Sequence, residues 1–245
     1  MREREAEERA VMGKASTGLT EKAAEVFRTL LSKQTRRSLR FDWLRLRTRL
    51  GTRRRVATDA RRLHFGCGKR RVPGWLNVDV RGSDLDVDLS SGALPFEDAQ
   101  FDVAVAQQFI EHLDLESELA PLLDELARVV RPGGDLWVSC PDMERVCQSY
   151  LADGGDALLR DRQMRWPDFS LGDVPARHMV NVVFHQAGEH INLFDFRLLS
   201  WLLDRHGFGD AKRVDEAAFR AAYPEFPIRN DDAFSLFVHA KRRSS

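Results

Sequence analysis

The chain has few cysteines, no long apolar run and no uncharged amino-terminal segment. Its three cysteines, Cys67, Cys140 and Cys147, form no C-x-x-C pair, which argues against a disulfide framework. No apolar segment approaches the roughly 18 residues that a membrane-spanning helix requires. Residues 1–9, MREREAEER, are too charged for a secretory signal peptide. These absences favour a cytoplasmic protein with reduced thiols.

A third glycine is also lacking at the turn in residues 63–80, LHFGCGKRRVPGWLNVDV. A dinucleotide-binding fingerprint reads G-x-G-x-x-G, whereas here only Gly66 and Gly68 are present. The order is still apolar strand, glycine turn, second apolar strand and then Asp79. Glycines allow a ligand to approach the backbone, and a carboxylate after the second strand accepts hydrogen bonds from a ribose. The segment predicts a site for a nucleoside-containing cofactor.

The downstream sequence gives this short motif its context. Its successive segments are an acidic strand at 84–89, Leu-Pro-Phe at 94–96, a strand at 101–105, Glu-His-Leu at 111–113, a helix at 115–130, Arg-Pro-Gly-Gly at 131–134 and a strand at 135–140. This order over residues 62–142 resembles the class I S-adenosylmethionine-dependent methyltransferases, in particular the small-molecule, methyltransferase type 11-like branch. A weaker resemblance extends over residues 186–241.

The resemblance implies a Rossmann-like, doubly wound α/β fold with seven strands, mostly parallel, and an antiparallel last strand. It implies S-adenosyl-L-methionine as cofactor and S-adenosyl-L-homocysteine as product. Asp79 would hold the ribose and Asp88 would lie near the adenine amine. The cofactor-binding residues that it implies are His64, Phe65, Gly66, Cys67, Gly68, Asp79, Asp88, Leu89 and Gln107. Of these, the His64 side chain is interpreted as structural because it precedes the turn on the strand.

The charge is uneven along the chain. Residues 1–62 hold 18 basic and 8 acidic side chains, whereas the remainder holds 20 and 30, so that a net charge of zero divides into +10 and −10. We expect a basic helical arm over residues 1–60 and a methyltransferase domain over 61–245. Helices are predicted over 21–33 and, from the spacing of Leu39, Trp43, Leu46 and Leu50, over about 39–50.

Three interpretations of this basic amphipathic arm remain open. Its apolar side packs on the domain, contacts an anionic membrane surface or a lipid-linked substrate, or contacts nucleic acid. Packing is favoured by the short connections that follow the first two strands, which leave no room for crossover helices. One face of the sheet would then be bare, and we expect residues 21–50 to cover it.

About fifty residues separate the fifth strand from the helix predicted at 196–206. This insertion, residues 143–195, is expected to form a cap above the carboxyl ends of the strands, where substrate specificity is usually built. Helices are predicted around 144–151 and 176–185. A strand at 211–214, an aromatic-rich connection and a last strand at 234–240 complete the chain.

Methylation of a hydroxyl requires a group that removes its proton, and histidine is the usual base. The candidates are His112, His178, His185 and His190, of which His112 and His190 are preferred. Glu111 joins them as a catalytic residue at the exit of the fourth strand. A metal bound by His178, His185, His190 and Asp195, or by Glu111 and His112, is the less favoured alternative, and no metal is expected.

The predicted function is O-methylation of a sugar, a glycan intermediate or another small metabolite. The fourth strand ends without the Asn/Asp-Pro-Pro-aromatic sequence of enzymes that methylate nucleobase amines, so nucleic acid is disfavoured as a partner. The alternatives are a non-catalytic methyltransferase-like partner or regulatory subunit, and a methyltransferase acting on RNA or protein. A peripheral position at the inner face of the membrane, through the basic arm, is a further expectation.

Overall fold

The computed structural model describes residues 29–51 and 56–244. The chain divides into two compact units, Met1–Leu46 and Arg47–Ser245, which are described separately. In the first unit, and continuing to Gly51, the structure shows helix α2, Lys33–Gly51. The helix predicted at residues 21–33 lies mostly outside the described residues.

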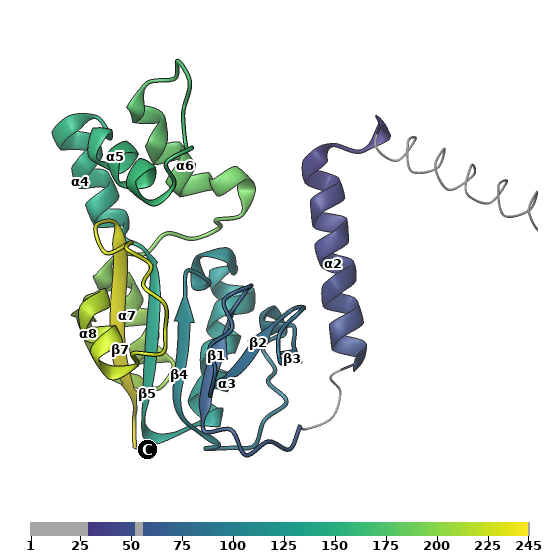
Figure 1. Cartoon of the computed structure of the whole chain (residues 1–245). Coiled ribbons are helices and arrows are strands. Elements are labelled where there is room, and N and C mark those ends of the chain that lie inside the picture. The colour runs from purple at the N-terminus through teal and green to yellow at the C-terminus, as the bar shows by residue number, and fades with distance from the viewer. Residues whose placement is uncertain (1–28, 52–55, 245) are drawn as a thin grey trace, which may run out of the picture. The chain divides into compact units, whose positions relative to one another are not determined.

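The second unit is built on a seven-stranded sheet with the order β3-β2-β1-β4-β5-β7-β6. The strands are β1 Arg62–Phe65, β2 Leu76–Asp79, β3 Leu85–Asp86, β4 Phe101–Gln107, β5 Val130–Pro141, β6 Phe208–Val214 and β7 Ser235–Arg242. Strands β1 to β5 pair in parallel, and β7 is antiparallel to both β5 and β6. The predicted doubly wound sheet with an antiparallel last strand is confirmed (Figure 1).

The larger hydrophobic core lies on the face that α3, Ala120–Val129, and α7, Phe196–Arg205, cover. Both helices are amphipathic and bury leucines at helical spacing. The helix predicted at 115–130 begins with a π-helical turn, Leu115–Leu119, before α3. The Arg-Pro-Gly-Gly segment at 131–134 lies within β5, where the register to β4 shifts between Phe101 and Val103.

The opposite face of the sheet carries a second core of mostly aromatic side chains. Its buried members are Val72, Trp75, Val103, Val105, Phe219, Phe226 and Phe237. Phe219 belongs to α8, Glu216–Ala222, a helix that the sequence analysis missed. The C-terminal connection supplies cover for this face, a role that was expected of residues 21–50, most of which belong to the first unit or lie outside the described residues. The rings of Phe226 and Trp75 meet edge to face at 4.9 Å.

Three helices form the cap, which Figure 1 shows beyond the carboxyl end of β4. They are α4 Met143–Asp153, α5 Asp156–Arg165 and α6 Met179–His185, and they share a small core around Val146 and Leu158. The sequence predicted α4 and α6 but not α5. The predicted third strand was too long, because only Leu85 and Asp86 pair as β3 and a 3-10 turn follows at Leu89–Ser91.

Helix α2 presents both arginines and large apolar side chains to solvent. Leu39, Trp43, Leu46 and Leu50 are each 46–58% exposed. None of the helices within residues 29–51 and 56–244 combines the length and apolarity needed to cross a membrane.

Candidate functional site

The glycine turn connects β1 to the irregular segment before β2. Gly66 and Gly68 have φ angles of 64° and 55°, a region that side chains disfavour. A Cβ on Gly66 would lie 2.2 Å from the ring of Phe109, so Gly66 allows the β4 exit to pack on the turn. A Cβ on Gly68 would meet no atom within 4 Å. Gly68 is therefore the position where the backbone is open to a ligand.

Asp79 ties the end of β2 to this turn. Its Oδ2 accepts a hydrogen bond from the Gly68 amide at 2.8 Å, and its Oδ1 accepts one from the Val80 amide. Burial raises the pKa of Asp79, and these two backbone donors oppose that rise. Each carboxylate oxygen has a second lone-pair direction, so Asp79 can accept hydrogen bonds from two ligand hydroxyls as well.

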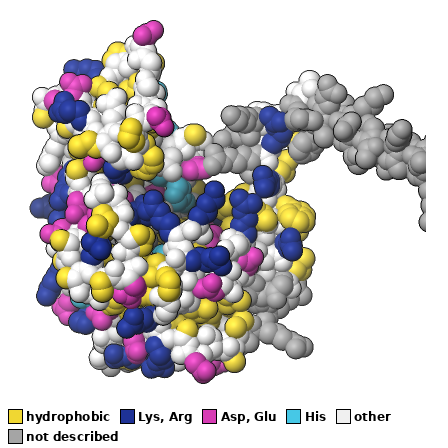
Figure 2. Space-filling model, viewed as in Figure 1, with side chains coloured by type: hydrophobic (Ala, Val, Ile, Leu, Met, Phe, Trp, Pro, Cys, Tyr) yellow, Lys and Arg dark blue, Asp and Glu magenta, His cyan; other side chains and the backbone are white. Residues whose placement is uncertain are grey.

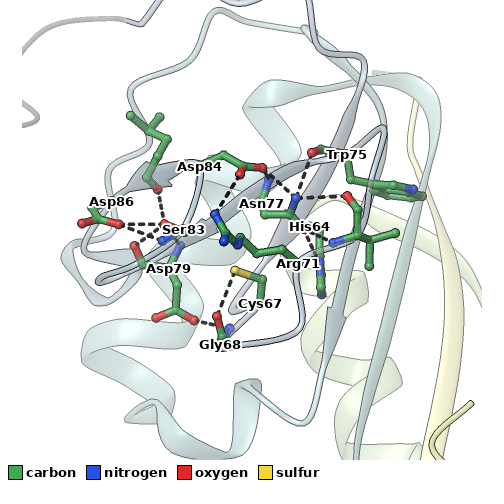
Figure 3. Close-up of polar contacts among 12 residues, drawn as sticks. His64, Cys67, Gly68, Arg71, Trp75, Asn77, Asp79, Ser83, Asp84 and Asp86 are labelled. Atoms are coloured by element: carbon green, nitrogen blue, oxygen red, sulfur yellow. Dashed lines mark hydrogen bonds and ion pairs between the residues drawn. The ribbon is translucent and has the colours of Figure 1, made fainter. Parts of the chain in front are cut away.

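Asn77 fixes the segment that lies between the turn and β2 (Figure 3). Its Oδ1 accepts from the Val72 amide and lies 3.0 Å from His64 Nδ1, while its Nδ2 donates to the Val72 and Trp75 carbonyls and to Asp84. This buried amide replaces the missing crossover helix as the element that orders the connection. His64 is thereby part of the scaffold, as the sequence analysis expected of its side chain.

Two other predicted cofactor residues follow β3. Asp88 is buried and caps the 3-10 turn Leu89–Ser91 through the Ser90 amide. It also accepts from Arg49 Nε at 2.5 Å, an ion pair within the second unit. Neither Asp88 nor Leu89 lines the cavity described below.

Cys67 lies between the two glycines with its thiol largely buried. Burial, and then the charge of Asp79, raises the thiol pKa to about 12. A thiol with that pKa is protonated at neutral pH and is a poor nucleophile. Cys67 is therefore a small packing residue in this turn.

The exit of β4 carries the acidic and histidine side chains at the base of the cap. Gln107 is the last residue of the strand, and its Nε2 is buried without a hydrogen-bond partner in the described chain. Gln108 has a φ of 55° and donates from Nε2 to Ser235 Oγ at 3.0 Å. A 3-10 turn, Ile110–His112, then turns Glu111 inward. The amides of Ile191 and Asn192 bond to the Glu111 carbonyl, which fixes the cap to this turn.

Glu111 is fully buried, and neither of its carboxyl oxygens has a hydrogen-bond partner among the described residues. Burial raises its pKa to about 8. At pH 7 the Glu111 side chain is therefore mainly the neutral acid, because an ionised carboxylate would lack solvation there.

His190 and His112 lie beside Glu111. His190 Nε2 is 4.0 Å from Glu111 Oε1, and the two imidazole rings have centroids 5.0 Å apart. His190 Nδ1 donates to the Val183 carbonyl and His112 Nδ1 to the Glu189 carbonyl, since a carbonyl oxygen can only accept. In the neutral form of each ring the proton is therefore on Nδ1, and Nε2 is the basic nitrogen. Burial is the largest cause that lowers the pKa of His190, to about 4.

These side chains surround a cavity of about 480 Å³ that extends from the glycine turn to the cap (Figure 2). Such a volume suits a small-molecule ligand. Of the predicted site residues, the cavity is lined by Gly66, Cys67, Gly68, Gln107, Glu111, His112 and His190. His64, Phe65, Asp79, Asp88 and Leu89 lie outside its lining. His178 lines a separate shallow pocket, and His185 lines neither of these two pockets.

Glu111, His112 and His190 are also the one group of three metal-ligating side chains in the described chain whose ligand atoms lie within 4.8 Å of one another. Two imidazoles and a carboxylate suit a transition metal such as iron or zinc. The other metal alternative, based on His178 and His185, finds no such cluster among the described residues.

Sequence reasoning missed the basic side chains of the cavity wall, which come from α5 and from the segment before β7. Arg162, Arg165 and Arg229 all line the cavity. Arg162 and Arg165 lie three residues apart and therefore on one side of a helix, a signal that an assignment of α5 would have revealed. No pattern in the sequence around Arg229 indicates that it lines a cavity.

The strand order and the glycine turn define a Rossmann-like protein that binds a nucleoside cofactor at the carboxyl ends of its strands. Residues 63–138 match the family model described as a methyltransferase domain. The matched segment contains β1, the glycine turn, Asp79 and most of β5. Residues 63–138 thus carry the sequence pattern of a methyltransferase domain.

Three solved structures are similar to this chain at low identity. A SAM-dependent methyltransferase from Thermotoga maritima is 15% identical, with 85% of this chain and 96% of that chain covered and a TM-score of 0.44. One from Methanosarcina mazei is 16% identical, with coverages of 78% and 96% and a TM-score of 0.45. One from Mesorhizobium loti is 17% identical, with coverages of 76% and 94% and a TM-score of 0.39. With scores below 0.5, these likenesses assign no role to any residue here. No curated protein matches the chain.

S-adenosylmethionine is the cofactor of this family, and the residues present fit it. The backbone is open to a ligand at Gly68. Asp79 can accept hydrogen bonds from a ribose, and Gln107 Nε2 can donate one to an amino acid moiety. The fit is therefore supported by the chemistry of the turn as well as by the family match.

Proposed function

We propose that the chain transfers a methyl group from S-adenosylmethionine to a hydroxyl of a sugar, a glycan intermediate or another small metabolite. The single observation that carries this proposal is the buried cluster of Glu111, His112 and His190 in the cavity that begins at the glycine turn. A hydroxyl must lose its proton when it gains a methyl group, and this cluster supplies bases in the required place.

In the proposal, the chain's own residues hold the cofactor along the turn. Gly68 lets the cofactor approach the backbone, Asp79 accepts from the ribose hydroxyls, and Gln107 donates to the amino acid moiety. His64, Phe65 and Leu89 support the turn from within the core, where they are buried. Cofactor binding supplies an activated methyl group on a sulfonium, so the protein mainly provides proximity and orientation.

His190 is the preferred base. Its ring is neutral at pH 7 because its pKa is about 4, and the bond from Nδ1 to the Val183 carbonyl leaves Nε2 to accept the hydroxyl proton. Glu111 lies 4.0 Å from that nitrogen, and its mainly neutral carboxyl group places a dipole rather than a full charge beside the ring. His112 faces the same space and is the second candidate.

The first experiment is a calorimetric titration with S-adenosylhomocysteine. Wild-type protein is expected to bind with a micromolar Kd, about −8 kcal/mol, and Asp79→Ala is expected to bind at least tenfold more weakly. Asp124→Ala is the matched control, because Asp124 on α3 is 67% exposed in its side chain, pairs with His206 and does not line the cavity. No binding to folded wild-type protein would contradict the proposal and favour the alternative of a non-catalytic partner subunit.

A second experiment concerns the acceptor. Labelled methyl donor is offered with pools of sugars, sugar phosphates and other hydroxyl-bearing metabolites, and with RNA and protein as the alternative acceptors. Label in a small molecule that is lost in His190→Gln but kept in His178→Gln supports the proposal, since His178 lies outside the cavity. Label that enters only RNA or protein would overturn it.

The exposed apolar side chains and arginines of α2 support a peripheral contact of the basic arm with an anionic membrane. Sedimentation with anionic and neutral vesicles tests it. Trp43→Ala is expected to reduce binding to the anionic vesicles severalfold, and equal sedimentation with both vesicle types would exclude an electrostatic contact.

A further inference from the structure

The cavity is lined by more basic than acidic side chains. The basic ones are Lys69, Arg70, Arg162, Arg165 and Arg229, and the acidic ones are Glu111, Asp161 and Asp231. With Glu111 neutral at pH 7, two carboxylates face five cations. Figure 2 shows dark-blue basic side chains beside a cyan histidine where the surface is hollowed below the cap. The wall of the cavity therefore carries an excess of positive charge.

The two carboxylates are already paired. Asp161 accepts from Arg165, one helical turn away on α5, and Asp231 accepts from Arg229 Nε at 2.8 Å. For Lys69, Arg70 and Arg162 no carboxylate of the described chain lies within ion-pair distance. These three cations thus have no ion-pair partner in the described chain.

Arg162 has no ion-pair partner in the described chain, and aromatic side chains orient it instead. Its guanidinium lies 4.7 Å from the ring centre of Trp166 and 5.7 Å from that of Phe169, so that two aromatic rings orient the planar group. Its Nε is buried and has no hydrogen-bond partner among the described residues. A buried donor without a partner, at the wall of a cavity, is expected to be satisfied by a ligand.

Arg229 is positioned by hydrogen bonds to two acidic side chains. Its own amide and that of Asn230 both donate to the carboxylate of Glu216, a buried residue at the start of α8. Its Nε is held by Asp231, which leaves the terminal nitrogens of the fork for the cavity. Across the same space the charge of Arg229, after burial, lowers the pKa of Arg70. The cations are therefore close enough to repel one another.

From this geometry we infer that the methyl acceptor carries a phosphate group, which Arg162 and Arg229 bind next to His190. The inference rests on the proposed function and specifies its substrate class. S-adenosylmethionine brings a sulfonium, an ammonium and one carboxylate, so its net charge of +1 adds to the excess in the cavity. A phosphate monoester carries about −1.5 to −2 at pH 7, whereas a carboxylate carries one charge. Guanidinium forks bind phosphate oxygens in pairs, which also orients the acceptor.

The test is a calorimetric titration with inorganic phosphate at constant ionic strength, with and without saturating S-adenosylhomocysteine. Arg162→Gln removes a guanidinium that has no acid partner, so it leaves no carboxylate unpaired. We expect phosphate to bind about tenfold more weakly to this variant, as for the loss of a charge-assisted pair. Arg162→Lys keeps the charge and is expected to bind with intermediate affinity.

Arg160→Gln is the matched control, because Arg160 is on the same helix, is 65% exposed in its side chain and pairs with Asp153. Its phosphate affinity is expected to equal that of the wild type. Equal weakening in Arg160→Gln and Arg162→Gln would overturn the inference, since it would show that phosphate binds to the basic surface. Acetate binding as tightly as phosphate would overturn the assignment of phosphate.

The same variants separate this inference from the proposed function. S-adenosylhomocysteine is expected to bind Arg162→Gln within twofold of the wild type, and melting temperatures report whether each variant is folded. If the wild type binds no S-adenosylhomocysteine, the proposed function fails. The phosphate titration without S-adenosylhomocysteine still shows whether Arg162 binds phosphate. If Arg162→Gln weakens S-adenosylhomocysteine as much as phosphate, Arg162 belongs to the cofactor site and the inference is overturned.

Discussion

Two buried histidines of this protein have the same lowered pKa and very different surroundings. The pKa of His64 and that of His190 are each about 4, and burial is the largest cause in both cases. His64 lies in the aromatic core, with Asn77 on Nδ1 and its ring centroid 5.0 Å from that of Phe226 in an edge-to-face contact. His190 faces a cavity and a carboxyl group. A lowered pKa therefore marks burial, and only what the ring faces distinguishes a scaffold residue from a candidate base.

The largest expected effect concerns Glu111, the carboxyl group that His190 faces. Its native pKa of about 8 exceeds the ordinary value of 4.5, so the native state binds more protons between these values and stability falls as pH rises through 8. The difference corresponds to about 5 kcal/mol as an upper bound. Glu111→Gln stays neutral, so its free energy of unfolding should lack this loss. Urea unfolding at pH 5, 7 and 9 measures it, and parallel pH profiles for the two proteins would contradict the assigned burial.

The second prediction compares the histidines directly. His190→Gln should lower the rate of methyl transfer by about 10²–10⁴-fold, the usual contribution of a general base. His64→Gln should leave the rate of the folded enzyme within a few-fold and act on stability instead, because its ring nitrogen serves Asn77. The measurement is kcat with the acceptor that the labelling experiment identifies. A large loss of kcat in His64→Gln, with an unchanged melting temperature, would reverse the distinction.

The contrast between these regions also shows what the sequence could and could not predict. The glycine turn, Asp79 and the strand exits are local patterns, because a parallel sheet brings consecutive strand ends to one edge. His190 was preferred from its place in the cap, and its closeness to Glu111 depends on the chain returning over β4, which no local pattern records.

The missed helices have a related cause. Helix α8 is seven residues long, and its Asp215 cap and the following EAAFRAA were readable as a helix start. However, its Phe219 packs against Trp75 and Trp137, which lie more than 80 residues earlier in the chain. The N-terminal helices are nearer in the sequence to that face, which is why its cover was expected from them. Arg229 was missed for the same reason, since its position depends on Glu216.

The third prediction concerns stability in acid, to which both histidines contribute in the same direction. Each has a native pKa of about 4 against an ordinary value of 6.5, so the unfolded state binds more protons between these values. Stability should fall as pH decreases from 6.5 to 4, by about 3 kcal/mol for each ring as an upper bound. His64→Gln and His190→Gln should each remove one part of this acid loss in urea unfolding at pH 4.5 and 7. If only one variant does so, the two rings are not equally buried in solution.

The last and smallest effect concerns which residues bind the cofactor, those of the glycine turn or those beside Glu111. Asp79→Asn keeps an oxygen acceptor on the cofactor turn and removes its charge, so we expect the affinity for S-adenosylhomocysteine to fall about tenfold, or about 1.4 kcal/mol. His190→Gln should change that affinity less than twofold, because its proton acceptor is needed only for the hydroxyl. Calorimetry on both variants measures the two effects. If His190→Gln weakened S-adenosylhomocysteine as strongly as Asp79→Asn, the cluster at Glu111 would be part of the cofactor site. The comparison would then no longer separate a region that binds the methyl donor from one that prepares the acceptor.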